Sequence, residues 1–350
     1  RLSRAGMKRI LVVSNMYPSP EKPYSGVFVK NQYECLKTLA GGEAEIDLFA
    51  MPRRFTGPIG TVLKYLAAAL RFLPRFFVRY DVVHVHYFVP LYFLAWAYAL
   101  IRARTRLVVT FHGTDASVKI QRPFMRRLAR RAIRRADVVI TVGETLSRDL
   151  AEHLGRGADY VLPAGVDRSM FFVEEGAEKR WDFVFVGSFL ERKGVREFLA
   201  VASSFGGSRA FCAVGSGPLA EVLEAHDNPP IDVLANLSQA EIRGILNASR
   251  FLLFPSHQEA FGLVVTESMY CGTPTIVSPI DSLAQRVDHG RTGFVAEGLN
   301  SEDIVAAARA ADALPPDAYA AMSAAARISG QDAALENVCR ELLAIYGVSD

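Results

Sequence analysis

The sequence contains little of what marks a secreted, metal-binding or membrane-spanning chain. Four cysteines occur in 350 residues, and their wide separation gives none of the spacings that metal sites use. We therefore interpret them as free thiols of a reducing compartment. No apolar run is long enough to cross a bilayer cleanly, and the first residues lack the apolar core of a signal peptide. These absences predict a cytoplasmic protein.

Two phosphate-binding patterns are also absent. The pattern Asp-x-Asp occurs nowhere in the chain, which argues against a diphosphate held by a metal ion. The loop after the first expected strand is not Gly-x-Gly-x-x-Gly, which counts against a dinucleotide site. We therefore predict neither a metal site nor a bound cofactor.

Charge is divided unevenly along a chain of globular composition. Half of the residues are hydrophobic and 22% are charged, and the length is enough for two domains of ordinary size. Residues 1–165 contain 26 Lys and Arg against 12 Asp and Glu, a formal charge of +14, whereas residues 166–350 carry −11. This division suggests that the first half meets an anionic surface.

Two basic helices are expected in that half. Residues Gly60–Arg79 form a helical stretch with a break at Pro74, and their basic side chains fall within one sector. Residues Pro123–Arg135 form a second helix, with six arginines on one broad side and no acidic partner among them. Helices of this kind suit the interface of an anionic membrane.

Other partners of the two helices are possible. Phe72, Phe76 and Phe77 would add insertion to the attraction at a membrane, whereas two ordinary solvated faces are the plainer interpretation. Nucleic acid is a competing partner. We rank it lower and predict no nucleic-acid partner, because no aromatic or recognition-helix pattern accompanies the charge.

The stretch at residues 254–278 is expected to carry the chemistry. It has the pattern of a strand end, a loop, a short helix, a turn and a second strand. The helix would start near Phe261 or Gly262, where its free N–H groups suit a phosphate or a sugar hydroxyl. Glu259 and Glu267 flank this start, and a carboxylate can accept two hydrogen bonds from neighbouring hydroxyls. Exposed surface charges are the alternative, which is weaker for Glu267 because its neighbours are apolar.

The same stretch resembles a known family. E-A-F-G-L-V-V-T-E, with P-S before it and C-G-T-P-T-I after it, resembles the E-x7-E signature of glycosyltransferase family 4. These are retaining enzymes of the GT-B fold that use nucleoside diphosphate sugars. The resemblance implies that Glu259 contacts the donor sugar and Glu267 the ribose. It implies also that the backbone of Phe261, Gly262 and Leu263 binds the sugar and the diphosphate.

Further segments resemble the same family. F-H-G-T-D would place His112 against the donor sugar, and the loop before the first helix would place Gly26 by the diphosphate. G-S-F-L-E-R-K-G resembles a diphosphate clamp in which Lys193 matches, and Arg192 would replace an arginine that the family often has at Ser188. The remaining implied donor-binding positions are Gly187, Gly215 and Leu237.

The order of the expected elements predicts the fold class. Strands alternate with helices, which indicates α/β sheets of parallel strands in both halves. The resemblance implies a GT-B fold of two Rossmann-like domains facing across a cleft. His84 and His86, near the end of an expected strand, are interpreted as structural. The expected parts are an acceptor-side N-terminal domain at 7–165, a linker at 166–180, a nucleotide-sugar donor domain at 181–330 and a C-terminal helix at 331–350 that packs back on the first domain.

We therefore predict a metal-independent retaining glycosyltransferase. It would move a hexosyl unit from a UDP- or GDP-linked sugar to the hydroxyl of an acceptor glycan or lipid-linked sugar, as in bacterial polysaccharide or glycolipid synthesis. The expected location is peripheral, on the inner face of the cytoplasmic membrane. Two alternatives remain open at this point: a nucleotide-sugar epimerase of the same fold, and a non-catalytic membrane scaffold.

Overall fold

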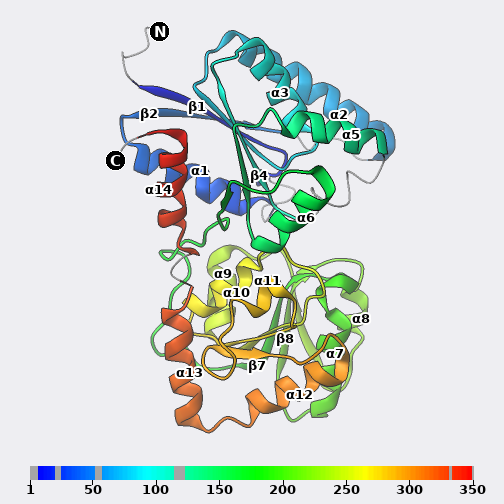
Figure 1. The fold of residues 1–350 in the computed structure, drawn as a ribbon. Coiled ribbons are helices and arrows are strands. Elements are labelled where there is room, and N and C mark those ends of the chain that lie inside the picture. The colour runs from blue at the N-terminus through cyan, green and yellow to red at the C-terminus, as the bar shows by residue number, and fades with distance from the viewer. Residues whose placement is uncertain (1–6, 20–24, 52–56, 114–122, 331–332, 349–350) are drawn as a thin grey trace. The chain divides into compact units, whose positions relative to one another are not determined.

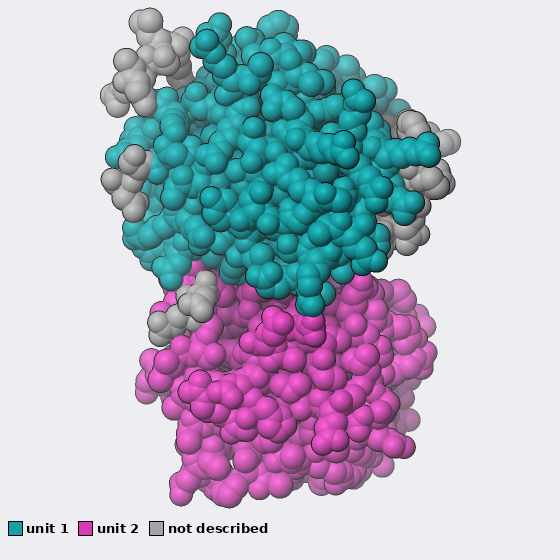
Figure 2. All heavy atoms as spheres, in the orientation of Figure 1, with its two compact units in different colours: residues 1–165, 335–350 teal, residues 166–334 magenta. Residues whose placement is uncertain are grey.

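The computed structural model describes residues 7–19, 25–51, 57–113, 123–330 and 333–348. The chain forms two compact units, coloured separately in Figure 2. Unit 1 comprises Arg1–Gly165 and Leu335–Asp350, and unit 2 comprises Val166–Ala334. Within the described ranges, no helix is both long and apolar enough to cross a membrane.

Unit 1 is built on a six-stranded parallel sheet (Figure 1). Its strands are rich in Val, Ile and Leu and buried along most of their length, as expected for a parallel sheet covered on both faces. The order across the sheet is β2-β1-β3-β4-β5-β6. The strands are β1 (Lys8–Ser14), β2 (Ala44–Ala50), β3 (Val82–His86), β4 (Arg106–Phe111), β5 (Val138–Thr141) and β6 (Tyr160–Val161).

The helices of unit 1 cover this sheet. They are α1 (Val27–Ala40), α2 (Gly57–Phe72), the 3-10 helix η1 (Leu73–Phe77), α3 (Leu91–Ile101), α5 (Pro123–Ile133), α6 (Glu144–Leu154) and α14 (Leu335–Tyr346). Helices α1 and α14 pack together, and their apolar residues share one core with Ile10, Val82 and Val108 of the sheet. The last helix of the chain is therefore part of unit 1.

Unit 2 repeats this architecture with a second parallel sheet, in the order β12-β11-β10-β7-β8-β9. Stacked phenylalanines, among them Phe183, Phe211 and Phe251, fill its centre. The strands are β7 (Trp181–Ser188), β8 (Phe211–Ser216), β9 (Ile231–Leu234), β10 (Ser249–Phe254), β11 (Thr275–Val277) and β12 (Gly293–Val295). The helices are η2 (Glu191–Lys193), α7 (Val195–Phe205), α8 (Ala220–Glu224), α9 (Gln239–Asn247), α10 (Leu263–Tyr270), α11 (Asp281–Ala284), α12 (Ser301–Asp312) and α13 (Pro316–Ile328).

The parallel α/β class predicted for both halves is confirmed by these two sheets. The segment at 166–180, expected as a linker, is counted within unit 2, because Val166 and Phe171 are buried in the core of that unit. The backbone N–H of Val166 also donates to the carbonyl of Ala333, next to the point where the chain returns to unit 1.

Two details of the basic helices differ from the sequence interpretation. Phe72 was expected on an outer apolar face, but it is fully buried, and its ring packs edge-on against Phe49 at 5.0 Å between centroids. Arg135 was expected to have no acidic partner, but it pairs with Asp137 at 3.8 Å. The chain passes from α2 into η1 next to Pro74, and Phe77, the last residue of η1, is 86% exposed.

Candidate functional site

The loop between β10 and α10 is fixed by a glycine at its end. Gly262 caps α10 with a φ of 77°, in the left-handed region that favours glycine. A Cβ atom there would lie 2.6 Å from Cδ2 of Leu283, so a larger residue would also displace α11. The first N–H groups of α10 are consequently held at the carboxyl end of β10, where open parallel sheets bind ligands.

Two predicted site residues, Lys193 and Glu259, meet in this loop. The ammonium of Lys193 forms an ion pair with Oε1 of Glu259, and the two side chains are only 15% and 14% exposed. The Lys193 ammonium also lies 5.9 Å from the ring centroid of Phe254. A shielded cation and carboxylate side by side can bind a charged phosphate and a sugar hydroxyl from adjacent positions.

Backbone contacts bring the two charges together. The carbonyl of Arg192 accepts hydrogen bonds from the N–H of His257 at 2.9 Å and from Oγ of Ser256 at 3.2 Å. Gly194 follows Lys193 with a φ of 78°, and a Cβ atom there would collide with the carbonyl oxygen of Pro255. Arg192 itself is exposed, and its side chain makes no ion pair with any described residue.

Glu267 lies one turn into α10 in a different environment. Burial raises the pKa of its carboxyl group from 4.5 to about 7. Within the described part of the chain, no hydrogen bond or ion pair to this carboxyl group is found, and burial is the one cause of its raised pKa. A ligand hydroxyl that donates to it would relieve the cost of this burial.

The two predicted glycines of the neighbouring strands face each other. Gly187 and Gly215 are in register on β7 and β8, and a Cβ atom on Gly215 would collide with the carbonyl of Gly187. Ser188, the next residue of β7, is exposed and pairs in register with Ser216. The adjacent strands β7 and β8 therefore both end in a glycine and a serine, which have short side chains.

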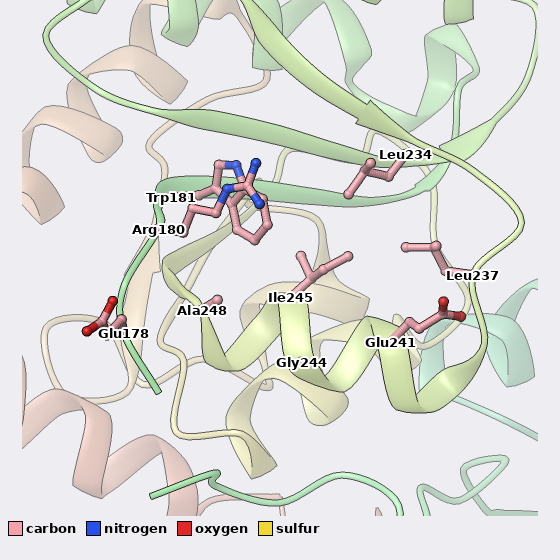
Figure 3. A pocket seen from close by; sticks show the side chains of 9 residues that line it. All are labelled: Glu178, Arg180, Trp181, Leu234, Leu237, Glu241, Gly244, Ile245 and Ala248. Atoms are coloured by element: carbon pink, nitrogen blue, oxygen red, sulfur yellow. The ribbon is translucent and has the colours of Figure 1, made fainter. Parts of the chain in front are cut away.

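Leu237 lines a pocket along α9, whose volume is about 530 Å³ (Figure 3). The lining includes neither Lys193 nor Glu259 nor Glu267, so the pocket is distinct from the charged loop. The lining residues are Glu178, Arg180, Trp181, Leu234, Leu237, Glu241, Gly244, Ile245 and Ala248.

The predicted residues of unit 1, Gly26 and His112, are connected through Phe28: Gly26 caps the helix that carries Phe28, and the Phe28 ring packs against His112. Gly26 caps α1 with a φ of 74°, and a Cβ atom there would lie 2.5 Å from the carbonyl carbon of Met16. Phe28, in the first turn of α1, places its ring centroid 4.9 Å from that of His112. His112 follows β4, and burial together with nearby His86 holds its pKa well below the ordinary value of 6.5. Its imidazole is therefore neutral.

One basic residue at the site was missed by the sequence interpretation. The guanidinium of Arg286 lies 3.7 Å above the ring centroid of Phe261 and donates to Oγ1 of Thr266. Burial lowers the pKa of Arg286 to about 10. Its Nε has no hydrogen-bond partner among the described residues. None of the motifs considered in the sequence includes Arg286, and its contacts with Phe261 and Thr266 form only in the folded chain.

A metal role finds no support within the described ranges, where no group of three or more His, Cys, Asp or Glu side chains could hold an ion. The charged groups found in unit 2 are instead the Lys193–Glu259 ion pair, the carboxyl group of Glu267, and the guanidinium of Arg286 over the ring of Phe261. Such a set can bind and orient a ligand that contains both anionic groups and hydroxyls.

Comparisons with known proteins agree with this chemistry. The model of Glycosyltransferase Family 4 matches residues 8–169, and that of Glycosyl transferases group 1 matches residues 167–328. Together they span both units. These matches do not favour the epimerase or the scaffold alternative.

Individual relatives are more distant. N-acetyl-alpha-D-glucosaminyl L-malate synthase of Bacillus anthracis is 27% identical over 62% of this chain and 61% of its own length, so the match spans about three fifths of that relative. D-inositol 3-phosphate glycosyltransferase of Pseudarthrobacter chlorophenolicus is 26% identical over 82% of this chain and 72% of its own. Anabaena HepE, solved with UDP-glucose, superimposes with a TM-score of 0.75 at 16% identity, covering 97% of this chain and all of HepE. The last likeness shows the fold, which is GT-B.

The raised pKa of Glu267 predicts a pH-dependent stability. Below about pH 4.5 the group is protonated in both the folded and the unfolded chain and costs nothing. As the pH rises to about 7, the unfolded chain releases this proton first, so the folded state is increasingly penalised and the full cost is present above pH 7. Glu267→Gln should therefore raise the free energy of unfolding relative to the wild type by up to about 3 kcal/mol at pH 8, and by much less at pH 5.

Urea unfolding of both chains at the two pH values measures this difference. Glu241→Gln is a control in which the effect on stability has the opposite sign. Hydrogen bonds from Ser238 lower the pKa of Glu241, so its contribution to the stability of the folded state grows as the pH rises. A difference between wild type and Glu267→Gln that does not change with pH would contradict the burial of this carboxylate.

Proposed function

We propose that this chain, which belongs to glycosyltransferase family 4, transfers a hexosyl unit from a nucleoside diphosphate sugar to an acceptor hydroxyl. Glycosyltransferase activity follows from the family. The observation that carries the finer proposal is the shielded Lys193–Glu259 pair beside the N-terminus of α10. UDP- and GDP-sugars are the donors we favour, and HepE, which shares the fold, was solved with UDP-glucose.

Each group near α10 has a proposed role. Lys193 and the first N–H groups of α10 bind the diphosphate and stabilise the charge that develops on it as it leaves. Arg192 is exposed beside them and can reach the same phosphates as a second cation. Glu259 accepts hydrogen bonds from the sugar, and Glu267 accepts them from the ribose. None of these steps needs a metal ion.

The reaction proposed is a same-face displacement. The bond between the anomeric carbon and the phosphate oxygen breaks, and the acceptor oxygen forms the new bond on the same face, so the configuration is retained. The acceptor hydroxyl gives its proton to the departing phosphate oxygen. Retention follows from the family resemblance, and this route uses no carboxylate as a covalent nucleophile.

We propose further that unit 1 binds an anionic membrane, where a lipid-linked acceptor is found. Unusually exposed apolar side chains support this: Leu63, Leu66, Leu70, Leu73 and Phe77 of α2 and η1, and Leu100 and Ile101 of α3, are 45–86% exposed. Helix α3 joins these to the basic helix, because Arg102 donates to the carbonyl of Phe76 and the hydroxyl of Tyr92 donates to that of Ala132 in α5. Five arginines of α5 and the residues after it are exposed: Arg126, Arg127, Arg130, Arg131 and Arg134.

Apolar side chains that insert and arginines that attract anionic headgroups together suit such a surface. We therefore propose a peripheral location on the inner face of the cytoplasmic membrane. An acceptor glycan in polysaccharide or glycolipid synthesis would be within reach there.

The donor site is tested by removing the cation. Lys193→Ala should weaken the binding of UDP or GDP by about 1.5–3 kcal/mol, the value of a hydrogen bond to a charged group, and should leave binding of the bare nucleoside almost unchanged. Titration calorimetry measures both. Arg196→Ala is the matched control, because Arg196 lies three residues away in an exposed ion pair with Glu191. Equal losses for nucleotide and nucleoside would place Lys193 outside the phosphate site.

The transfer reaction is tested with the two glutamates. After a thermal-shift screen identifies the donor, Glu259→Gln should reduce turnover far more than nucleotide affinity, because it meets the sugar. Glu267→Gln should weaken nucleotide binding even without a sugar, because it meets the ribose. Similar behaviour of the two variants towards the nucleotide alone would refute the assigned roles, and no transfer from any nucleotide sugar would refute the function.

The membrane proposal is tested by co-sedimentation. The protein should bind vesicles containing anionic lipid much better than neutral vesicles, and less well at high salt, where headgroup attraction is screened. Combined substitution of Arg126, Arg130 and Arg134 by Glu should reduce this binding, and Phe77→Ser should reduce the part that persists at high salt. Arg340→Glu, on α14 of the same unit, is the control that should bind normally. If the wild-type protein does not bind anionic vesicles at low salt, the membrane proposal is refuted and a soluble acceptor is favoured.

A further inference from the structure

Three histidines, two of them buried and the third partly exposed, form a column on one side of the sheet of unit 1. His84 and His86 are two residues apart on β3 and so point to the same face, which α1 and α14 cover. Their ring centroids are 4.4 Å apart. His112, at the end of the adjacent strand β4, continues the column, with its centroid 5.3 Å from that of His86 and the two planes 23° apart. The column ends at the proposed contact with the donor sugar.

Both ends of the column are fixed by hydrogen-bonding groups. Nδ1 of His84 lies 2.5 Å from the hydroxyl of Tyr346 in α14, and its Nε2 lies 2.7 Å from Oγ1 of Thr110. At the other end, Nδ1 of His86 lies 3.0 Å from Nε2 of His112. His84 and His86 are almost completely shielded from solvent, at 0% and 1% exposure.

All three imidazoles are neutral, because burial lowers the pKa of each and their proximity opposes a second positive charge. A neutral imidazole has one N–H donor and one acceptor nitrogen. A hydrogen bond between His86 and His112 therefore joins their tautomers. When Nδ1 of His86 carries the proton, Nε2 of His112 must accept and Nδ1 of His112 carries its own proton. In the opposite case, Nε2 of His112 is the donor and its Nδ1 the acceptor.

The ring plane of His112 is held as well. The Tyr87 ring lies 4.6 Å from it and the Phe28 ring 4.9 Å, on two further elements. Tyr87 has a φ of 69°, a left-handed conformation that is costly for a residue with a side chain and that persists only where its surroundings impose it. Tyr87 is the residue that follows His86 in sequence, and in this conformation its ring packs against His112. Orientation and tautomer are thus controlled by consecutive residues.

We infer that His86 is a positioning residue for sugar transfer: it sets the tautomer and the ring orientation with which His112 meets the donor sugar. The inference rests on the proposed function, because it assumes that His112 contacts that sugar. His86 itself does not touch the reacting atoms and acts only through the bond to His112.

The test compares one substitution that keeps an aromatic ring with another that keeps the hydrogen bond. His86→Phe keeps an aromatic ring in the column and removes the bond, so kcat should fall about 10- to 100-fold, as expected for a misplaced contact, while KM for the donor stays within about twofold. His86→Asn places an amide near the position of Nδ1, where it can donate or accept, and should recover most of the lost kcat. Tyr346→Phe is the matched control, because it removes a buried hydroxyl from the same column without touching His112 and should leave kcat near the wild-type value.

A second measurement reads the tautomer directly. Nitrogen-15 spectra of the imidazole rings, with the His112 signal assigned by its loss in His112→Gln, should show one tautomer in the wild type and a mixture in His86→Phe. Wild-type kcat or an unchanged His112 tautomer in His86→Phe would overturn the inference. So would a loss of kcat that His86→Asn fails to recover, because that pattern indicates packing alone.

The two levels of the proposal fail differently. If the wild type transfers no sugar from any UDP- or GDP-linked donor, the proposed function is wrong, and the nitrogen-15 spectra still decide whether His86 sets the state of His112. If transfer is measured and His86→Phe retains it in full, the function stands and the positioning role is refuted.

Discussion

The charged loop of unit 2 depends on the close approach of two backbones. The turn at Gly194 lies against the carbonyl of Pro255, at a distance that no side chain at position 194 would allow. That approach lets the backbone carbonyl of Arg192 accept hydrogen bonds from the loop that follows β10, and it brings Lys193 to Glu259. Because a shielded cation and carboxylate neutralise each other, both can lose water without the full cost of an isolated buried charge. When a ligand with a phosphate and hydroxyls binds, the phosphate can contact Lys193 and the hydroxyls can donate to Glu259.

The candidate site residue of unit 1 lies among neutral polar groups, unlike the charged pair of unit 2. Its candidate sugar contact, His112, belongs to a column of neutral imidazoles, where burial suppresses charge. Specificity in such a column comes from the direction of hydrogen bonds and the fixed tautomers, since each neutral ring offers one donor and one acceptor. The C-terminal helix α14 takes part through Tyr346, which lies 262 residues from His84 in sequence, so distant parts of the chain contribute to one polar core.

The outer surface of unit 1 follows from the same helices. Aromatic residues of α2, η1 and α3 alternate between the core and solvent, as Phe72 is fully buried and Phe77 is 86% exposed. The break next to Pro74 separates the two rings, since Phe72 ends α2 and Phe77 ends η1. Exposed leucines on α2 and arginines on α5 therefore occupy neighbouring helices, with α3 contacting both η1 and α5. A peripheral membrane surface is the economical interpretation of apolar and basic side chains arranged in this way.

The sequence by itself determined the class of the fold and most of the candidate residues. Buried runs such as that of β1 and the alternation with helices predict parallel sheets, because local periodicity records which faces are buried. The resemblance to the E-x7-E signature pointed to Glu259 and Glu267 as candidate residues. Only the tertiary structure decided that Lys193 pairs with Glu259, that Phe72 is internal, that Arg286 stacks on Phe261 and that His86 contacts His112. The paired residues, including Phe72 with its partner Phe49, lie 23 to 66 residues apart in sequence, and no local pattern encodes which distant side chains a folded chain brings into contact.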